Sequence, residues 1–204
     1  MMDEEHHKQH NHRRFRAAHK HKLHSEERKR FQPASAILEL ATFVAPRQIV
    51  DIGVGTGYFA LPLLQHLPEA RVTGLDVSSE MLQTFEARAT SAGVQDRITM
   101  VLHDLDEQPW PLAPKSFDLA LAMSLTHEVA DRNAFAREVR RILRDNGRIL
   151  VVDWDPDAKA LHGPPTDHRL APGQVISTMT QQGLVLEDQL PLYEDFYSLV
   201  FTKG

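Results

Sequence analysis

The stretch QIVDIGVGTGYFALPL, residues 48–63, decides the fold of this chain. The apolar run QIVDIG predicts a short buried strand, and the residues from Thr56 to Leu67 predict a helix. The turn between them is glycine-rich. Glycine lets backbone approach a ligand closely, and a helix N-terminus offers free N–H groups to an anion. A tight turn that binds nothing would show the same pattern.

Outward from this stretch, apolar strands alternate with amphipathic helices. Strands are expected at 71–77, 97–104, 117–125 and 148–154, and helices at 78–93, 131–147 and 174–183. Two closing strands, 184–192 and 196–203, are expected to form an antiparallel pair because few residues separate them. The pattern predicts an α/β fold: a doubly wound, Rossmann-like, seven-stranded and mostly parallel sheet with a C-terminal antiparallel strand pair.

The composition narrows the function classes. The 204 residues include no cysteine, which removes disulfides, thiolate zinc sites and cysteine nucleophiles. No apolar run approaches the ~20 residues of a membrane span, and the N-terminal stretch lacks the apolar core of a signal peptide. We therefore expect a cytoplasmic protein without a membrane span.

Charge divides the chain into two parts. Residues 1–30 hold nine Lys and Arg against five Asp and Glu, whereas the rest holds 14 against 23. An acidic body does not favour nucleic acid as a partner. We expect a basic, His-rich arm over 1–32, disordered to about residue 12, with Phe15, Leu23 and Phe31 docked on a domain over 33–204. The arm's histidines, His6, His7, His10 and His12, offer a nickel or zinc site or simply a solvated tail.

Acidic residues end two further strands. Asp76 closes the second strand, 19 positions after Gly57. A carboxylate there can accept both ribose hydroxyls of an adenosine, or it can simply favour the N-terminus of the next helix. Asp104 closes the third strand, where it can contact the amino group of adenine or form a solvent-facing turn.

Several stretches together resemble the class I S-adenosylmethionine (SAM)-dependent methyltransferases. IVDIGVGTGYFALPL (49–63) is similar to their motif I, and GLDVSSEML (74–82) to their ribose-binding motif. HDLDEQPWPLAPKSFDLALAMSLTHEV (103–129) and REVRRILRDNGRILVVDW (137–154) resemble the stretches around their fourth and fifth strands, with Asp-Asn-Gly at the turn where relatives have Pro-Gly-Gly. The likeness is strongest to the type 11 group, which includes quinone-biosynthesis enzymes, and the segment 14–33 resembles the arm of its small bacterial members.

The resemblance implies SAM as cofactor, S-adenosylhomocysteine as product, and a role for each matching residue. Asp51 and the glycine-rich turn would hold the methionine end, Asp76 the ribose and Asp104 the adenine edge. The implied cofactor-binding set is Asp51, Gly53, Val54, Gly55, Gly57, Tyr58, Asp76, Val77, Met81, Asp104, Leu105, Met123 and Ser124. Met123 and Ser124 would lie beside the sulfonium, and Tyr58 over the methionine moiety.

His127 follows the fourth strand, near the expected site of transfer. It is a candidate general base or acceptor-orienting residue, or a structural histidine at a helix start. The chain lacks the Asn/Asp-Pro-Pro-aromatic motif of nucleic-acid amino methyltransferases and any large inserted domain. We therefore expect a small-molecule acceptor and a monomer or homodimer.

Two other functions use the same features. A nicotinamide-dependent oxidoreductase shares the turn and the acidic residue, but its Gly-x-Gly-x-x-Gly pattern would need glycine at Tyr58. A non-catalytic SAM-binding partner protein would keep the glycine-rich turn and Asp76 without turnover.

Overall fold

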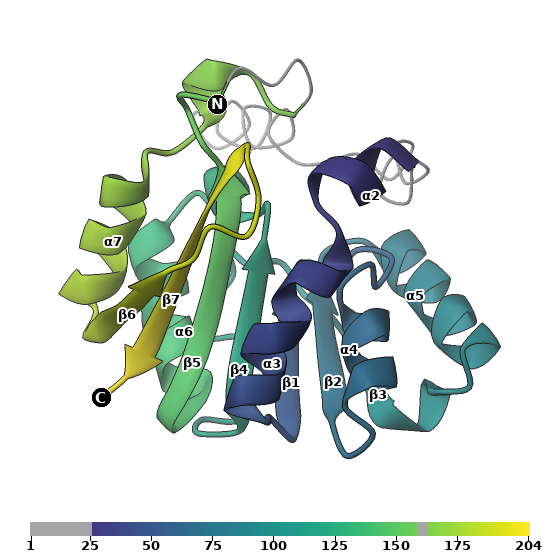
Figure 1. Cartoon of the computed structure of the whole chain (residues 1–204). Helices are drawn as coiled ribbons and strands as arrows, with labels where there is room; N and C mark the ends of the chain where they lie inside the picture. Colours follow the sequence, from purple (N-terminus) through teal and green to yellow (C-terminus); the bar gives the residue numbers. More distant parts are fainter. Residues whose placement is uncertain (1–25, 159–162) are drawn as a thin grey trace, which may run out of the picture.

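A computed structural model of the chain describes residues 26–158 and 163–204. This part forms a seven-stranded sheet in the order β3-β2-β1-β4-β5-β7-β6 (Figure 1). The strands are β1 (Gln48–Ile52), β2 (Arg71–Asp76), β3 (Ile98–Leu102), β4 (Phe117–Met123), β5 (Leu143–Trp154), β6 (Leu184–Gln189) and β7 (Phe196–Lys203). Only β7 is reversed, pairing antiparallel with both β5 and β6. The predicted fold class and antiparallel closing pair are confirmed.

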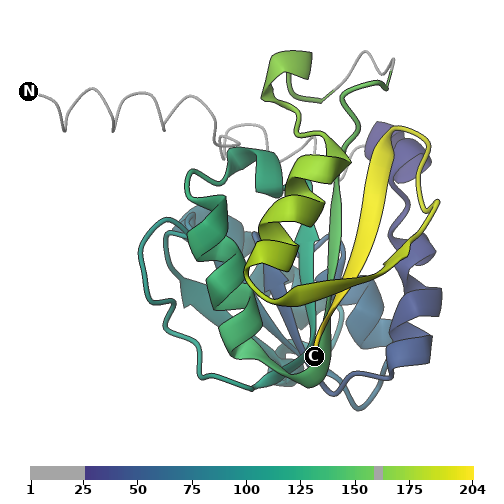
Figure 2. The same ribbon diagram turned by 90° about the vertical axis from the view of Figure 1, so that its left-hand side faces the viewer.

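Helices cover both faces of the sheet (Figure 2). One layer contains α3 (Leu38–Val44), α4 (Ala60–His66) and α5 (Ser79–Ser91), and the other α6 (Arg132–Ile142) and α7 (Pro172–Gln181). Short 3₁₀ turns complete the set: η2 (Ala34–Ile37), η3 (Gln95–Arg97), η4 (Thr126–Glu128) and η5 (Thr166–His168).

Two apolar cores explain why the strands are apolar on both faces. Side chains alternate along a strand, so Leu119 and Leu121 of β4 pack with α3, α4 and α5, while Ala120 and Ala122 pack with α6 and α7. Because β1 lies between β2 and β4, the chain order reverses at β1. Ligands of doubly wound folds bind beyond the strand ends at such a point.

The start of α4 differs from the prediction. The helix begins at Ala60 rather than Thr56, because the glycine-rich turn keeps its positive φ angles through Gly57. Pro62 is consequently the third residue of the helix, where its missing N–H would have no partner within the helix.

The helix predicted to continue to Gly147 was also wrong at its end. It stops at Ile142, since Leu143 adopts an extended conformation and pairs with Phe117 of β4. Asn146 takes a left-handed conformation, with φ 64°, in the part of β5 between Leu143 and Arg148, where the pairing with β4 is irregular. Asn tolerates that conformation better than most residues, so Asp145-Asn146-Gly147 can form this irregular stretch without the Pro-Gly-Gly of relatives.

The described segment before the sheet is α2 (Glu26–Phe31), which lies beyond the carboxyl ends of the parallel strands, at the top of Figure 1. Phe31 packs against Trp154 and Phe196, at ring-centroid distances of 5.7 and 6.0 Å. The expectations for Phe15, Leu23 and the arm's histidines lie outside the described residues.

No helix within residues 26–158 and 163–204 has the length and apolarity needed to cross a membrane.

Candidate functional site

The glycine-rich turn leaves β1 and folds against the end of β2. Gly53, Gly55 and Gly57 have φ angles of 74°, 53° and 76°. At Gly57 a Cβ atom would also overlap the ring of Phe85 on α5. Gly57 is therefore needed both for the backbone conformation and for the close approach of α5.

Asp76 holds this turn in place from the end of β2. One carboxylate oxygen accepts a hydrogen bond from the Gly55 N–H at 2.8 Å, and the other accepts from the Ser78 N–H at 2.9 Å. Burial raises the pKa of Asp76, although the backbone N–H groups of Ser78, Gly55 and Val77 oppose the rise. A carboxylate oxygen accepts more than one hydrogen bond, so Asp76 retains capacity for a ligand.

Asp51, near the end of β1, is a buried acid. Only 2% of its surface is exposed. Within the described ranges, no group donates a hydrogen bond to its carboxylate. Burial raises the pKa of Asp51 to about 7, the charge of Asp76 adds to the rise, and Arg28 opposes it. An acid buried without a donor is costly to the fold, which points to a cationic ligand.

The remaining implied adenosine contacts lie along the ends of β2 and β3. Met81 is buried in the first turn of α5, which Ser78 caps by accepting from the Met81 N–H. Val77 is 46% exposed, as an open binding surface requires. Asp104 and Leu105 are half-buried, and a carboxylate oxygen of Asp104 accepts from the Asp106 N–H.

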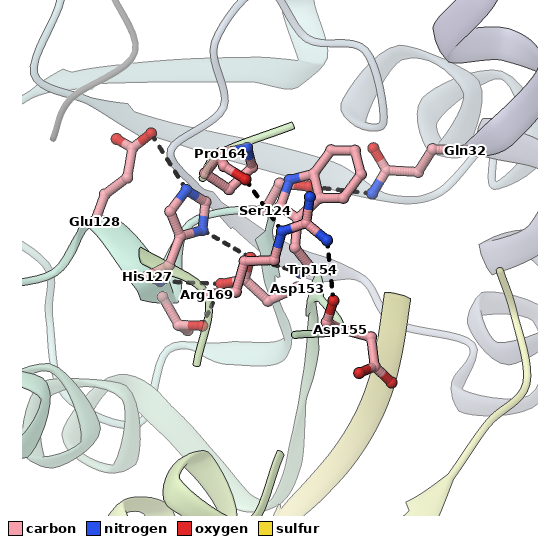
Figure 3. Close-up of polar contacts among 10 residues, drawn as sticks. Gln32, Ser124, His127, Glu128, Asp153, Trp154, Asp155, Pro164 and Arg169 are labelled. Atoms are coloured by element: carbon pink, nitrogen blue, oxygen red, sulfur yellow. Dashed lines mark hydrogen bonds and ion pairs between the residues drawn. The ribbon is translucent and has the colours of Figure 1, made fainter. Parts of the chain in front are cut away.

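The end of β4 contributes Met123 and Ser124. Met123 is buried, whereas Ser124 is half-buried and takes a left-handed conformation with φ 56°. A non-glycine residue in that region is strained and is often found at functional sites. The Ser124 hydroxyl accepts a hydrogen bond from the Gln32 amide at 3.2 Å, so a residue before β1 reaches the end of β4 (Figure 3).

Val54 and Tyr58 complete the turn. Both side chains are buried, and the Tyr58 hydroxyl donates to the Gln32 carbonyl at 3.1 Å. The guanidinium of Arg28 lies 4.6 Å from the centre of the Tyr58 ring. The structure therefore brings the turn, Asp51, Asp76, Tyr58 and Ser124 to one edge of the sheet.

His127 lies at the same edge and is paired with Asp153, near the end of β5 (Figure 3). The His127 Nδ1 atom lies 2.7 Å from one carboxylate oxygen of Asp153. The second oxygen accepts from the His127 N–H at 3.0 Å and from the Thr126 hydroxyl. With Nδ1 donating to Asp153, the neutral ring carries its lone pair on Nε2, which is 3.8 Å from a Glu128 oxygen.

The surroundings of His127 set its proton affinity. Burial alone would lower the pKa of His127, but the hydrogen bond and charge of Asp153, with the charge of Glu128, outweigh burial. Arg169 also opposes the rise. The pKa of His127 is consequently raised above its ordinary value.

Sequence reasoning missed Arg28, Gln32 and Asp153. Arg28 and Gln32 lie in a polar segment whose composition resembles a solvated tail, and no local pattern shows that Gln32 is only 1% exposed. Asp153 carried a usable signal, because it closes an apolar strand just as Asp76 does.

The described residues contain no group of three or more His, Asp or Glu side chains arranged to hold a metal ion.

The fold and the glycine-rich turn are those of Rossmann-like domains, a class that binds ligands at the carboxyl edge of the sheet. Comparison with known proteins narrows this class. Residues 49–147 match the family described as "Methyltransferase domain". A SAM-dependent methyltransferase from Aquifex aeolicus superposes with a TM-score of 0.81 at 18% identity, covering 94% of this chain and 100% of the other.

Two curated relatives are similar in sequence to part of the chain. The malonyl-[acyl-carrier protein] O-methyltransferase of Legionella pneumophila is 32% identical over 114 residues, which are 56% of this chain and 38% of the relative. The demethylmenaquinone methyltransferase of Thermotoga maritima is 32% identical over 120 residues, 59% of this chain and 49% of the relative. The chain thus spans less than half the length of each relative.

These comparisons confirm the resemblance to the class I SAM-dependent methyltransferases and to their type 11 group. The family match favours this interpretation over the nicotinamide-dependent alternative.

Proposed function

We propose that this protein transfers the methyl group of SAM to a small-molecule acceptor and releases S-adenosylhomocysteine. One observation carries the proposal: the buried carboxylate of Asp51 beside the glycine-rich turn lacks a donor within the described residues. The methionine end of SAM carries an ammonium group, which is the kind of ligand that a buried carboxylate needs.

The residues at the sheet edge fit this cofactor. Asp51 and the turn Gly53–Gly57 would bind the methionine end, with Val54 and Tyr58 as its apolar wall. Asp76 would bind the ribose, while Val77 and Met81 flank the adenine and Asp104 and the Leu105 N–H contact its edge. Met123 and Ser124 would lie beside the sulfur.

SAM, when bound, supplies a methyl group already activated on a positively charged sulfur. The protein must then hold the acceptor atom in line with the sulfur–methyl bond and exclude water. His127 would remove the acceptor's proton at Nε2, since Nδ1 is committed to Asp153. In this proposal Asp153 is a positioning residue that acts through His127.

The acceptor itself is proposed to be small. Of the two relatives, the one named for demethylmenaquinone supports a small acceptor, whereas the other is named for malonyl-[acyl-carrier protein]. The region after residue 30 is acidic, which disfavours nucleic acid. We propose that the protein works on such an acceptor as a monomer or homodimer.

Thermal unfolding tests cofactor identity. SAM and S-adenosylhomocysteine should raise the melting temperature, whereas NAD and NADP should leave it unchanged. A ligand at a hundredfold excess over its Kd stabilises the native state by about 2.7 kcal/mol. Stabilisation by NADH without any by SAM would refute the proposal. Binding of SAM without methyl transfer to any acceptor tested would favour a non-catalytic partner protein.

A further inference from the structure

The segment before the sheet contains a cation that faces the proposed cofactor site. The Arg28 guanidinium on α2 lies 4.6 Å from the centre of the Tyr58 ring and 5.4 Å from that of Phe59. Both rings belong to the loop that joins β1 to α4. A guanidinium stacked on aromatic faces in this way is held in a defined orientation.

Gln32 fixes the same guanidinium from a second side. Its amide oxygen accepts hydrogen bonds from Nε and Nη2 of Arg28, at 3.2 and 3.0 Å. Its amide nitrogen donates to the Ser124 hydroxyl at the end of β4. Gln32 therefore ties Arg28 to the strand end where the sulfur of the cofactor is proposed to lie.

The charge of Arg28 is complementary to that of Asp51. Burial lowers the pKa of Arg28 to about 10, while Tyr58, Asp51 and Tyr193 oppose the fall. Arg28 and Asp51 thus interact electrostatically. The Asp51 carboxylate nevertheless receives no hydrogen bond from the described residues. The site presents one anion on the strand that precedes the glycine-rich turn and one cation stacked on the Tyr58 ring that follows it.

An α-amino acid end is a ligand of matching chemistry, because it carries one ammonium and one carboxylate. We propose that Arg28 binds the α-carboxylate of the methionine moiety of SAM, opposite the ammonium bound by Asp51. This inference rests on the proposed function. It makes α2 a wall of the cofactor site.

Contacts to the body support this role for α2. The Tyr58 hydroxyl donates to the Gln32 carbonyl, and the Tyr193 hydroxyl donates to the Pro33 carbonyl at 3.2 Å. Phe31 packs on Trp154 and Phe196 at the ends of β5 and β7. The guanidinium is therefore presented from a backbone that is anchored on both sides of the site.

The test compares two ligands that differ only in the carboxylate: S-adenosylhomocysteine and its decarboxylated form, S-adenosyl-3-thiopropylamine. Calorimetry on the full-length wild-type protein should show tighter binding of the first by roughly 10- to 100-fold, the value of a charge-assisted hydrogen-bonded pair. Arg28→Met should lose this preference by weakening S-adenosylhomocysteine alone. Arg30→Met, an exposed arginine of the same helix, is the matched control and should bind like the wild type.

The outcomes separate the two proposals. If the wild-type protein fails to bind S-adenosylhomocysteine, both the proposed function and this inference are refuted. If the wild type binds but Arg28→Met keeps its preference, or loses affinity equally for both ligands, only the role of Arg28 is refuted. Arg28→Lys keeps the charge and provides the measurement should Arg28→Met not fold: it should retain part of the preference.

Discussion

Replacing Asp51 by asparagine should stabilise the ligand-free protein while weakening its binding of SAM. The pKa of Asp51 is raised from 3.8 to about 7 in the folded chain, mainly by burial. A difference of about 3 in pKa corresponds to about 4 kcal/mol of unfavourable folding free energy when the group is ionised. Burying the asparagine amide costs about half of that gain, which leaves a net stabilisation of about 2 kcal/mol.

The pH dependence identifies the cause. Well below pH 3.8 the carboxyl is protonated in both folded and unfolded chains, so ionisation of Asp51 costs nothing there. As pH rises from about 4 to 7 the unfolded chain ionises first, and the stability of the wild type falls relative to Asp51→Asn. Above pH 7 the difference is constant, and the melting temperature of Asp51→Asn should be higher by about 4–8 °C for a domain of this size.

Thermal unfolding of both proteins from pH 4 to 8, followed by circular dichroism, measures this difference. Asp118→Asn is the matched control, because its carboxylate accepts from the Arg47 and Gln48 N–H groups and pairs with Arg144. These donors outweigh burial and lower the pKa of Asp118, so its replacement should destabilise the protein. The reasoning is refuted if Asp51→Asn is no more stable than the wild type at pH 8, or if the difference does not change with pH.

Two further predictions concern Asp76 and the pair formed by His127 and Asp153. Asp76→Ala should weaken S-adenosylhomocysteine binding by roughly 10- to 100-fold in calorimetry, because charge-assisted hydrogen bonds are lost. Replacement of the exposed Asp96 by alanine is the control and should leave the affinity unchanged. Unchanged affinity in Asp76→Ala would contradict the ribose assignment. His127→Ala should bind SAM normally but lose about 10²–10⁴-fold in turnover of an acceptor identified by screening. Because catalysis requires deprotonated His127, the wild-type rate should rise with pH, with an inflection at the raised pKa of His127. Asp153→Asn should move this inflection to lower pH. An unchanged pH profile in Asp153→Asn would show that the pair has only a structural role.

The fold could be predicted from the sequence because the central strands are apolar on both faces and the helices that cover the sheet are apolar on one. Two of the errors are the start of α4 and the end of α6. There a positive φ angle at Gly57 and the pairing of Leu143 with Phe117 override helix propensity. Pairing between distant segments leaves no local pattern in the sequence.

The site could be predicted only in part. The glycine-rich turn and the acids of the first strands follow from one rule, that parallel strands meet at one sheet edge. Arg28 and Gln32 do not follow from it, because their burial depends on how α2 docks on Tyr58 and Ser124. A segment that looks solvated by composition can therefore pack against the proposed site.

The number of donors around each strand-end carboxylate separates its roles. Asp153 receives the N–H groups of His127 and Trp154, the Thr126 hydroxyl and the His127 ring, so its lone pairs are occupied and it suits holding a neighbour in place. Asp76 receives two backbone N–H groups and can accept more. Asp51 receives no hydrogen bond from the described residues, although it is nearly as buried as Asp153. Aspartates at equivalent strand ends thus differ in the number of hydrogen-bond donors around them. Asp51 has the fewest donors, so a cationic ligand suits it best.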